Sequence, residues 1–285
     1  MEKSNSSGPG AKTTGKEAAP PTAKAKKTNS QGFRTFKGVF TPSALTIFGV
    51  IMYLRVGWVL GNEGLFATLL IVTMASAITF LTGLSISATA TNRQVKGGGA
   101  YYMISRSLGV EAGAAVGLPL FLAQALGISF YLTGFAESVH GFLPTVSIQI
   151  IASVALVLLF VLAYTSADLA LKTQFFILAL IVASLVSFFA GSVPPDGFTA
   201  PAGEVSTDVG FWIAFAVFFP AVTGIEAGIS MSGDLKDPAR SLPRGTLGAI
   251  IAGYVIYIAI PIVLSANVPK EILKTNPMVM AEYAY

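Results

Sequence analysis

The chain has no cysteine and a single histidine, His140, among its 285 residues. Without cysteine there can be no disulfide and no thiolate metal site, and one histidine cannot form the imidazole cluster of a typical catalytic metal centre. Only 11% of the residues are charged, less than half of the roughly 25% that is usual for soluble domains. Neither a bound metal nor a Ser-His-Asp set is expected, and we predict that the protein is not an enzyme.

One glycine cluster resembles a phosphate-binding loop only superficially. Gly97-Gly98-Gly99 lacks the Lys-Ser/Thr pair that such a loop requires, and it does not follow a strand. We interpret these glycines as a place where a loop packs closely against helices. No cofactor is therefore expected.

Apolar residues dominate what is present. The chain is 53% hydrophobic with a mean hydropathy of +0.71, values that belong to membrane proteins. Several apolar stretches are long enough to cross about 30 Å of hydrocarbon as helices. They predict an all-α membrane protein with about seven transmembrane helices, at 41–60, 64–88, 111–139, 147–165, 170–190, 210–232 and 245–266.

Basic residues predict the orientation. Eight Lys or Arg precede the first span, and others lie in 89–110, at Lys172 and in 233–244. The intervening loops have none, at 61–64, 140–146 and 191–209. By the positive-inside rule, the N-terminus is cytoplasmic in a multi-pass protein of the plasma (inner) membrane. The net charge of +4 then reflects topology, and no nucleic acid partner is expected.

Composition also predicts three regions. Residues 1–35 are basic and have few large apolar side chains, so we expect a disordered cytoplasmic tail. Residues 36–266 are expected to form a transmembrane domain that holds the predicted helices. Residues 267–285 are expected to begin an extracellular loop in which the chain is truncated.

Two of the apolar segments carry helix-breaking residues at corresponding places. Pro, Thr and Gly occur near the middle of 42–51 and again in 220–228. Such breaks persist in lipid only where the freed backbone groups line a cavity or bind a ligand. A pair of interrupted spans is typical of a secondary transporter.

Three ionisable residues lie within or at the rim of the spans: Arg55, Glu137 and Glu226. A charge at membrane depth costs at least about 2.5 kcal/mol, so each marks a functional site by default. Arg55 and Glu137 lie toward the outer ends of the first and third spans, at similar depth and with opposite charge. They form a predicted outer gate pair, or else each side chain reaches the headgroups separately.

Several ordered motifs resemble the cation-chloride cotransporters of the amino acid–polyamine–organocation superfamily. The matching segments include TIFGVIMYLR at 46–55, GGGAYYMISRSLG at 97–109, FFPAVTG at 218–224 and SGDLKDP at 232–238. The resemblance implies a LeuT-like inverted-repeat fold in which the first and sixth helices unwind around the substrate. This chain would then hold the first repeat and the start of the second.

The resemblance also implies ion sites. Potassium prefers neutral oxygens, and the family pattern assigns carbonyls or side-chain oxygens at Thr46, Ile47, Tyr131, Pro220 and Thr223. Thr46 stands where many members have Asn. The helix-one half of a sodium site would come from Leu45 and Phe48.

Chloride needs N–H donors, which the start of a half-helix supplies together with the favourable end of its dipole. The resemblance implies a first chloride site at Gly49, Val50 and Ile51, and a second at Gly224, Ile225 and Glu226.

Glu226 departs from the family, in which an apolar residue is common. Its carboxylate could repel or replace the second chloride, bind an ammonium group, or become neutral through burial and donate a hydrogen bond. We therefore predict a secondary active transporter in a lipid bilayer that couples potassium, either alone or together with sodium, to chloride, and a homodimer is one candidate assembly. The main alternative is an amino acid or amine permease. A seven-span receptor is a third alternative with less support from the sequence.

Overall fold

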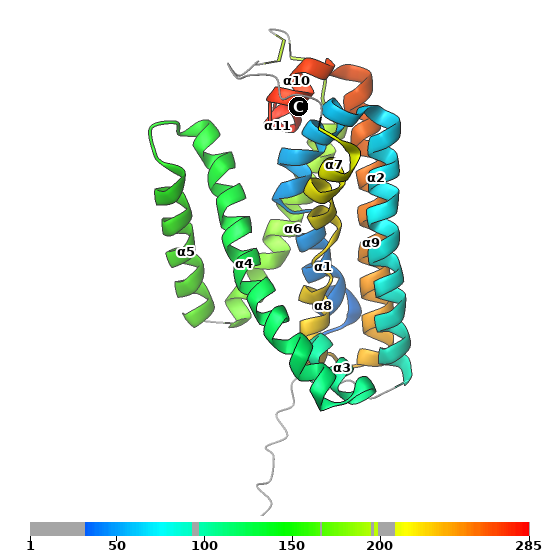
Figure 1. The fold of residues 1–285 in the computed structure, drawn as a ribbon. Helices are drawn as coiled ribbons and strands as arrows, with labels where there is room; N and C mark the ends of the chain where they lie inside the picture. Colours follow the sequence, from blue (N-terminus) through cyan, green and yellow to red (C-terminus); the bar gives the residue numbers. More distant parts are fainter. Residues whose placement is uncertain (1–31, 93–96, 166, 195–196, 199–208, 285) are drawn as a thin grey trace, which may run out of the picture. The chain divides into compact units, whose positions relative to one another are not determined.

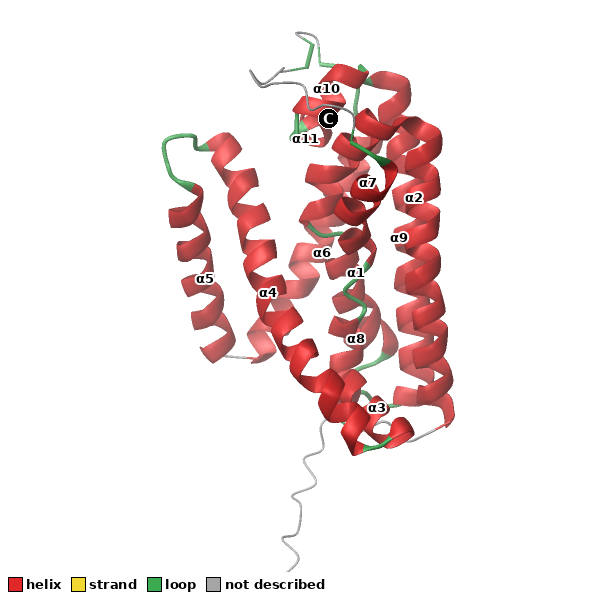
Figure 2. Ribbon diagram, in the orientation of Figure 1, coloured by secondary structure: helices red, strands yellow, loops and turns green. Residues whose placement is uncertain are grey.

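The computed structural model describes residues 32–92, 97–165, 167–194, 197–198 and 209–284. Helices make up nearly all of this part, and the only strand-like pairing in it is an isolated bridge between Phe33 and Leu235 (Figure 2). Most of the predicted tail, residues 1–31, lies outside the described residues. The all-α prediction is confirmed for the part that the structure describes.

The first two predicted spans form one nearly continuous helical stretch. It runs over the 57 residues Phe36–Asn92 and comprises η1 (Phe36–Phe40), α1 (Thr41–Ile47) and α2 (Val50–Asn92), with Phe48 and Gly49 between α1 and α2. A straight helix of that length would measure about 85 Å, far more than a membrane is thick. The stretch is instead interrupted at Gly64, which has φ 75° and ψ 172°. In Figure 1 the blue part rises and the cyan part descends beside α9, so two crossings are present.

The other predicted spans are found as helices close to the expected bounds. Six apolar helical stretches are long enough to cross a membrane in the described residues, and the first contains the two crossings just described. The remaining elements are α3 (Gly99–Leu108), α4 (Val110–Phe142), α5 (Ile148–Thr165), α6 (Ala167–Ala190), α7 (Phe211–Phe218), η2 (Phe219–Val222), α8 (Glu226–Ser230), η3 (Met231–Asp234), α9 (Pro238–Asn267), α10 (Lys270–Thr275) and α11 (Val279–Tyr283).

Two segments expected as loops contain helices. Residues 89–110 include α3, and the glycine at its start packs closely against another segment, as predicted: a Cβ on Gly99 would lie 3.1 Å from the Cα of Ser230. Residues 267–285 include α10 and α11, which pack on α2. A Cβ on Gly61 would lie 2.7 Å from the amide nitrogen of Lys274, so a glycine in α2 permits this contact.

The core forms where α9 packs against α1 and the second half of α2. Close approach again depends on glycine. A Cβ on Gly253 of α9 would lie 2.6 Å from the Ile47 side chain, and one on Gly83 of α2 would lie 2.8 Å from Ile250. By contrast, α4 and α5 expose large apolar side chains such as Phe121 and Phe160. This surface is typical of helices covered by lipid or by other helices.

Candidate functional site

Both predicted helix breaks are present, and they contact each other. The first helix ends at Ile47 and resumes at Val50, and the second break lies between η2 and α8. Thr46 is in the last turn of α1, and its hydroxyl lies 2.8 Å from the carbonyl oxygen of Gly224 and equally close to that of Ser43. Gly224 has φ +97°, and a Cβ there would lie 2.7 Å from the Cβ of Thr46. The contact therefore requires glycine at this position.

Six backbone amides at the breaks lack an acceptor. The first helical amides of any helix have no partner within that helix, and capping side chains usually supply one. In the described part of the chain, no backbone or side-chain acceptor is found for these amides. They belong to the two sets predicted to bind chloride: Gly49, Val50 and Ile51 before α2, and Gly224, Ile225 and Glu226 before α8.

The carbonyl oxygens predicted to bind potassium already accept hydrogen bonds from the protein. Pro220 accepts from the hydroxyl of Thr223 at 2.8 Å and from the Thr223 amide at 3.3 Å. Ile47 accepts from a hydroxyl of α9 at 2.6 Å. Because a carbonyl oxygen has two lone pairs, the Ile47 oxygen can still face a cation, whereas the Pro220 oxygen would have to release one of its two donors.

Tyr257 supplies that hydroxyl, and the sequence interpretation missed it. Its side chain is fully buried in α9, and the hydroxyl lies 2.6 Å from the Ile47 oxygen and 3.2 Å from the Ala221 oxygen. Phe218 packs edge-on against the ring, with 5.3 Å between centroids. A tyrosine inside an apolar span is a weak sequence signal, since a buried phenol needs a partner but the sequence does not name it.

Tyr131 of α4, a predicted potassium ligand, reaches the first break. It is half-buried, and a Cβ on Gly49 would lie 3.7 Å from its ring. One turn further along α4, Gly134 allows Val50 to approach closely. The structure thus brings Tyr131 beside the first break.

Glu226 is the first residue of α8 and is partly exposed. A carboxylate in the first turn of a helix is favoured by the exposed amides and the dipole. No lysine or arginine lies within ion-pair distance of it among the described residues.

The two predicted sodium ligands flank the first break. Leu45 lies in the last turn of α1, and Phe48 is the first residue after that helix. The amide of Phe48 donates the last hydrogen bond of α1, to the oxygen of Ala44. The carbonyl of Phe48 itself lies beyond the end of that helix. The sodium role stays a prediction.

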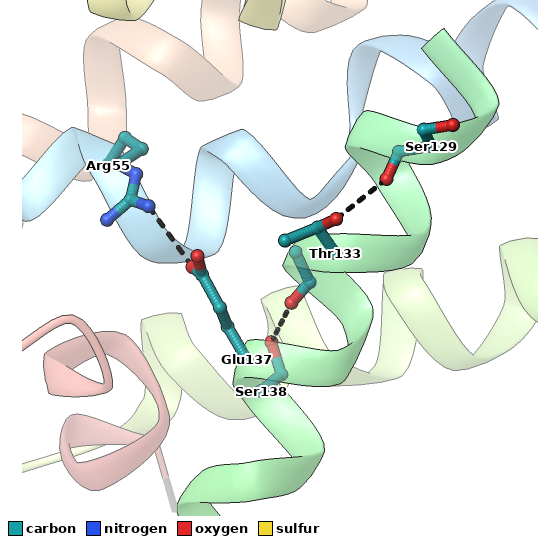
Figure 3. A network of polar contacts seen from close by, with 6 residues as sticks. Arg55, Ser129, Thr133, Glu137 and Ser138 are labelled. Atoms are coloured by element: carbon teal, nitrogen blue, oxygen red, sulfur yellow. Dashed lines mark hydrogen bonds and ion pairs between the residues drawn. The ribbon is translucent and has the colours of Figure 1, made fainter. Parts of the chain in front are cut away.

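Arg55 and Glu137 form an ion pair between α2 and α4. The guanidinium Nη2 lies 3.1 Å from the Glu137 Oε2, with the two side chains 41% and 35% exposed (Figure 3). Next to the pair is a small cavity of about 50 Å³, and Val50 and Ile51 line it as well. The ion pair therefore stands beside one set of unpaired amides, and its role as a gate is a proposal.

Comparison with known families agrees with this architecture. The amino acid permease family model matches residues 38–280. The chain therefore belongs to the amino acid permease family, and it is an integral, multi-pass membrane protein with the predicted LeuT-like fold.

The most similar relatives identify a narrower group. Solute carrier family 12 member 1 of Mus musculus is 38% identical over 264 residues, which cover 84% of this chain and 24% of that protein. Member 2 of Squalus acanthias is 36% identical over 263 residues, covering 84% and 22%. The bumetanide-sensitive sodium-(potassium)-chloride cotransporter of Manduca sexta is 37% identical over 252 residues, covering 78% and 24%.

These relatives confirm the resemblance to the cation-chloride cotransporters that the motifs indicated. Their names describe transporters, not enzymes. The chain spans about a quarter of the length of these relatives.

Proposed function

We propose that this chain provides the ion-binding part of a secondary active transporter that couples potassium to chloride. The observation that carries the proposal is the contact between two broken helices at which six amides have no acceptor. Unpaired amides in an apolar interior are costly, and an anion would satisfy them. The similarity to named chloride cotransporters supports the choice of chloride.

The first chloride site is expected to be the stronger one. Gly49, Val50 and Ile51 open the long helix α2, whose dipole favours an anion. Arg55, one turn further along, lines a cavity beside these residues together with its ion-pair partner Glu137, so the pair adds little net charge there. The second set precedes the five-residue α8 and carries the Glu226 carboxylate, so both the dipole and the local charge are less favourable there.

Potassium is proposed to bind between the breaks. Thr46 and Ile47 would contribute carbonyl oxygens from the end of α1, where the α-helix dipole is negative. Pro220 and Thr223 would contribute from the second break and Tyr131 from α4. Uncharged carbonyl and hydroxyl oxygens of this kind suit a large alkali cation. Sodium would use Leu45 and Phe48 as part of its shell.

A permease for amino acids or amines is the second candidate. Glu226 favours it, because a carboxylate that has no ion-pair partner among the described residues could bind an ammonium group. The amides of the first break would then bind the substrate carboxylate. The family model that matches this chain is itself that of the amino acid permeases.

Placement in the cell follows from the same proposal. The basic loops support a cytoplasmic N-terminus and insertion in the plasma (inner) membrane. A homodimer is proposed as the working state. The exposed apolar side chains of α4 and α5 are compatible with contact with lipid.

Ligand-dependent thermal unfolding of the purified chain in detergent tests the proposal. Potassium chloride should raise the melting temperature above that in choline gluconate, because a ligand at 100 times its Kd stabilises by about 2.7 kcal/mol. Tyr131→Phe removes one oxygen and should shift the potassium dependence to higher concentrations. Tyr164→Phe is the matched control, since Tyr164 is exposed on α5.

Three outcomes would contradict the ion assignment. Equal melting temperatures in potassium chloride and in choline gluconate would exclude specific binding of potassium and chloride. Stabilisation by amino acids or amines, without potassium or chloride, would favour the permease. An unchanged potassium dependence in Tyr131→Phe would remove that residue from the site. In the full-length protein, chloride-dependent uptake of radiolabelled rubidium is the matching transport measurement.

A further inference from the structure

A basic cleft lies at the end of the helices away from α10 and α11, and none of the proposed ion ligands lines it. It has a volume of about 550 Å³ and is lined by Arg34, Thr35, Lys236, Asp237, Arg240, Ser241 and Arg244. Four of these side chains are cationic, and all four are exposed. Only Arg240 has an acidic partner among the described residues, at 3.6 Å from Asp237.

The cleft is held together by segments about 200 positions apart. The hydroxyl of Thr35 donates to that of Ser241 at 3.1 Å. Beside it, the amide of Phe33 donates to the backbone carbonyl oxygen of Asp234 at 2.8 Å, and the carbonyl oxygen of Phe33 accepts from the Lys236 amide at 3.1 Å. A Cβ on Gly32 would lie 2.7 Å from the Lys236 nitrogen, so glycine permits this pairing. These contacts fix Arg34 opposite the basic residues of α9.

The electrostatics of the cleft favour an anion. Like charges brought to one cleft repel one another, and an anion would relieve this repulsion. The cleft also surrounds the start of the 30-residue helix α9, whose dipole is positive at that end. The chain's own N-terminal residues 1–31 supply few compensating charges, since their only carboxylates are Glu2 and Glu17.

The position of the cleft indicates where the anion comes from. Arg34 directly precedes the first apolar stretch, and Arg244 lies in the first turns of α9, so both are near the membrane surface. Basic clefts beside helix ends bind phosphorylated lipid headgroups, and the cytoplasmic leaflet carries anionic lipid. We propose that this cleft binds a phosphate group, and that its source is the headgroup of an anionic phospholipid.

Native mass spectrometry of the purified chain tests the proposal, with phosphatidic acid and phosphatidylcholine as competing probes. The parent should retain phosphatidic acid in preference to phosphatidylcholine. Arg34→Gln with Arg244→Gln should weaken this retention by about five-fold for each charge removed. Lys172→Gln with Lys270→Gln is the control, because it removes the same charge outside the cleft and should retain the lipid.

The arms of the experiment separate the two sources of phosphate. Inorganic phosphate alone should not raise the melting temperature of the parent. Stabilisation by inorganic phosphate that the cleft variant loses would reassign the cleft to a free anion and overturn the lipid assignment. Equal loss of lipid in the control variant, or no preference in the parent, would overturn the proposal outright. If the double variant does not fold, Arg34→Gln and Arg244→Gln are compared singly.

Discussion

The hydroxyl of Tyr257 lies 2.6 Å from the carbonyl oxygen of Ile47. That oxygen is the last of helix α1 and is one of the predicted potassium ligands. The same hydroxyl is 3.2 Å from the oxygen of Ala221 in η2, directly before the second break. One buried side chain of α9 therefore reaches both broken helices, and it holds them at a fixed separation.

Tyr257→Phe should destabilise the protein. The ring would stay in place, but a buried carbonyl would lose its donor, which costs about 1–3 kcal/mol. Chemical or thermal unfolding of the purified chain measures the effect. Tyr254→Phe, also on α9, should change stability little, because Tyr254 is 37% exposed and its contact with Thr73 is open to solvent. Equal effects of the two substitutions would show that the bridge contributes nothing.

Gly224→Ala should damage the contact between the breaks. A left-handed backbone costs a non-glycine residue about 1–2 kcal/mol, and the added methyl would also press on Thr46. Gly127→Ala in α4 is the control, because nothing lies within 4 Å of the new methyl and its backbone is helical. It should stabilise by up to about 1 kcal/mol. A neutral Gly224→Ala in unfolding experiments would contradict the observed geometry.

The Arg55 and Glu137 pair can be tested by exchanging its charges. Arg55→Glu and Glu137→Arg should each reduce transport by the full-length protein, and the double exchange should restore part of it, because the attraction survives the swap. The pair is partly exposed, so its contribution to stability should be only about 0.2–1 kcal/mol. If the double variant is no better than the worse single variant, the pair does not act as a gate.

Glu226 should determine the number of chloride ions. Potassium with one chloride is electroneutral, so a fixed carboxylate in place of a second chloride would suit that pairing. Glu226→Gln should then steepen the dependence of rubidium uptake on chloride concentration while potassium is still required. The measurement uses the full-length protein and its Glu226→Gln variant. Uptake of amines by the parent without potassium, lost in the variant, would instead establish the permease.

The spans and both helix breaks could be predicted from the sequence because their causes are local. A long apolar run must be helical in lipid, where the backbone has no other hydrogen-bond partners. Pro220, Thr223 and Gly224 interrupt that ladder wherever the helix packs. The family could also be recognised, because ordered motifs record the same local chemistry.

Contacts between distant segments were decided by the tertiary structure. The helices α10 and α11 were expected as loop because short helices have little stability alone, and they form by packing on α2 beside Gly57 and Gly61. Tyr257 reads as one more aromatic residue of an apolar span until α9 crosses the end of α1, 210 positions away in the chain. The sequence by itself determined where the helices break and so which backbone groups lack a partner within their own helix. The crossing of the helices decided which side chains contact those groups, because such contacts depend on packing that no local pattern encodes.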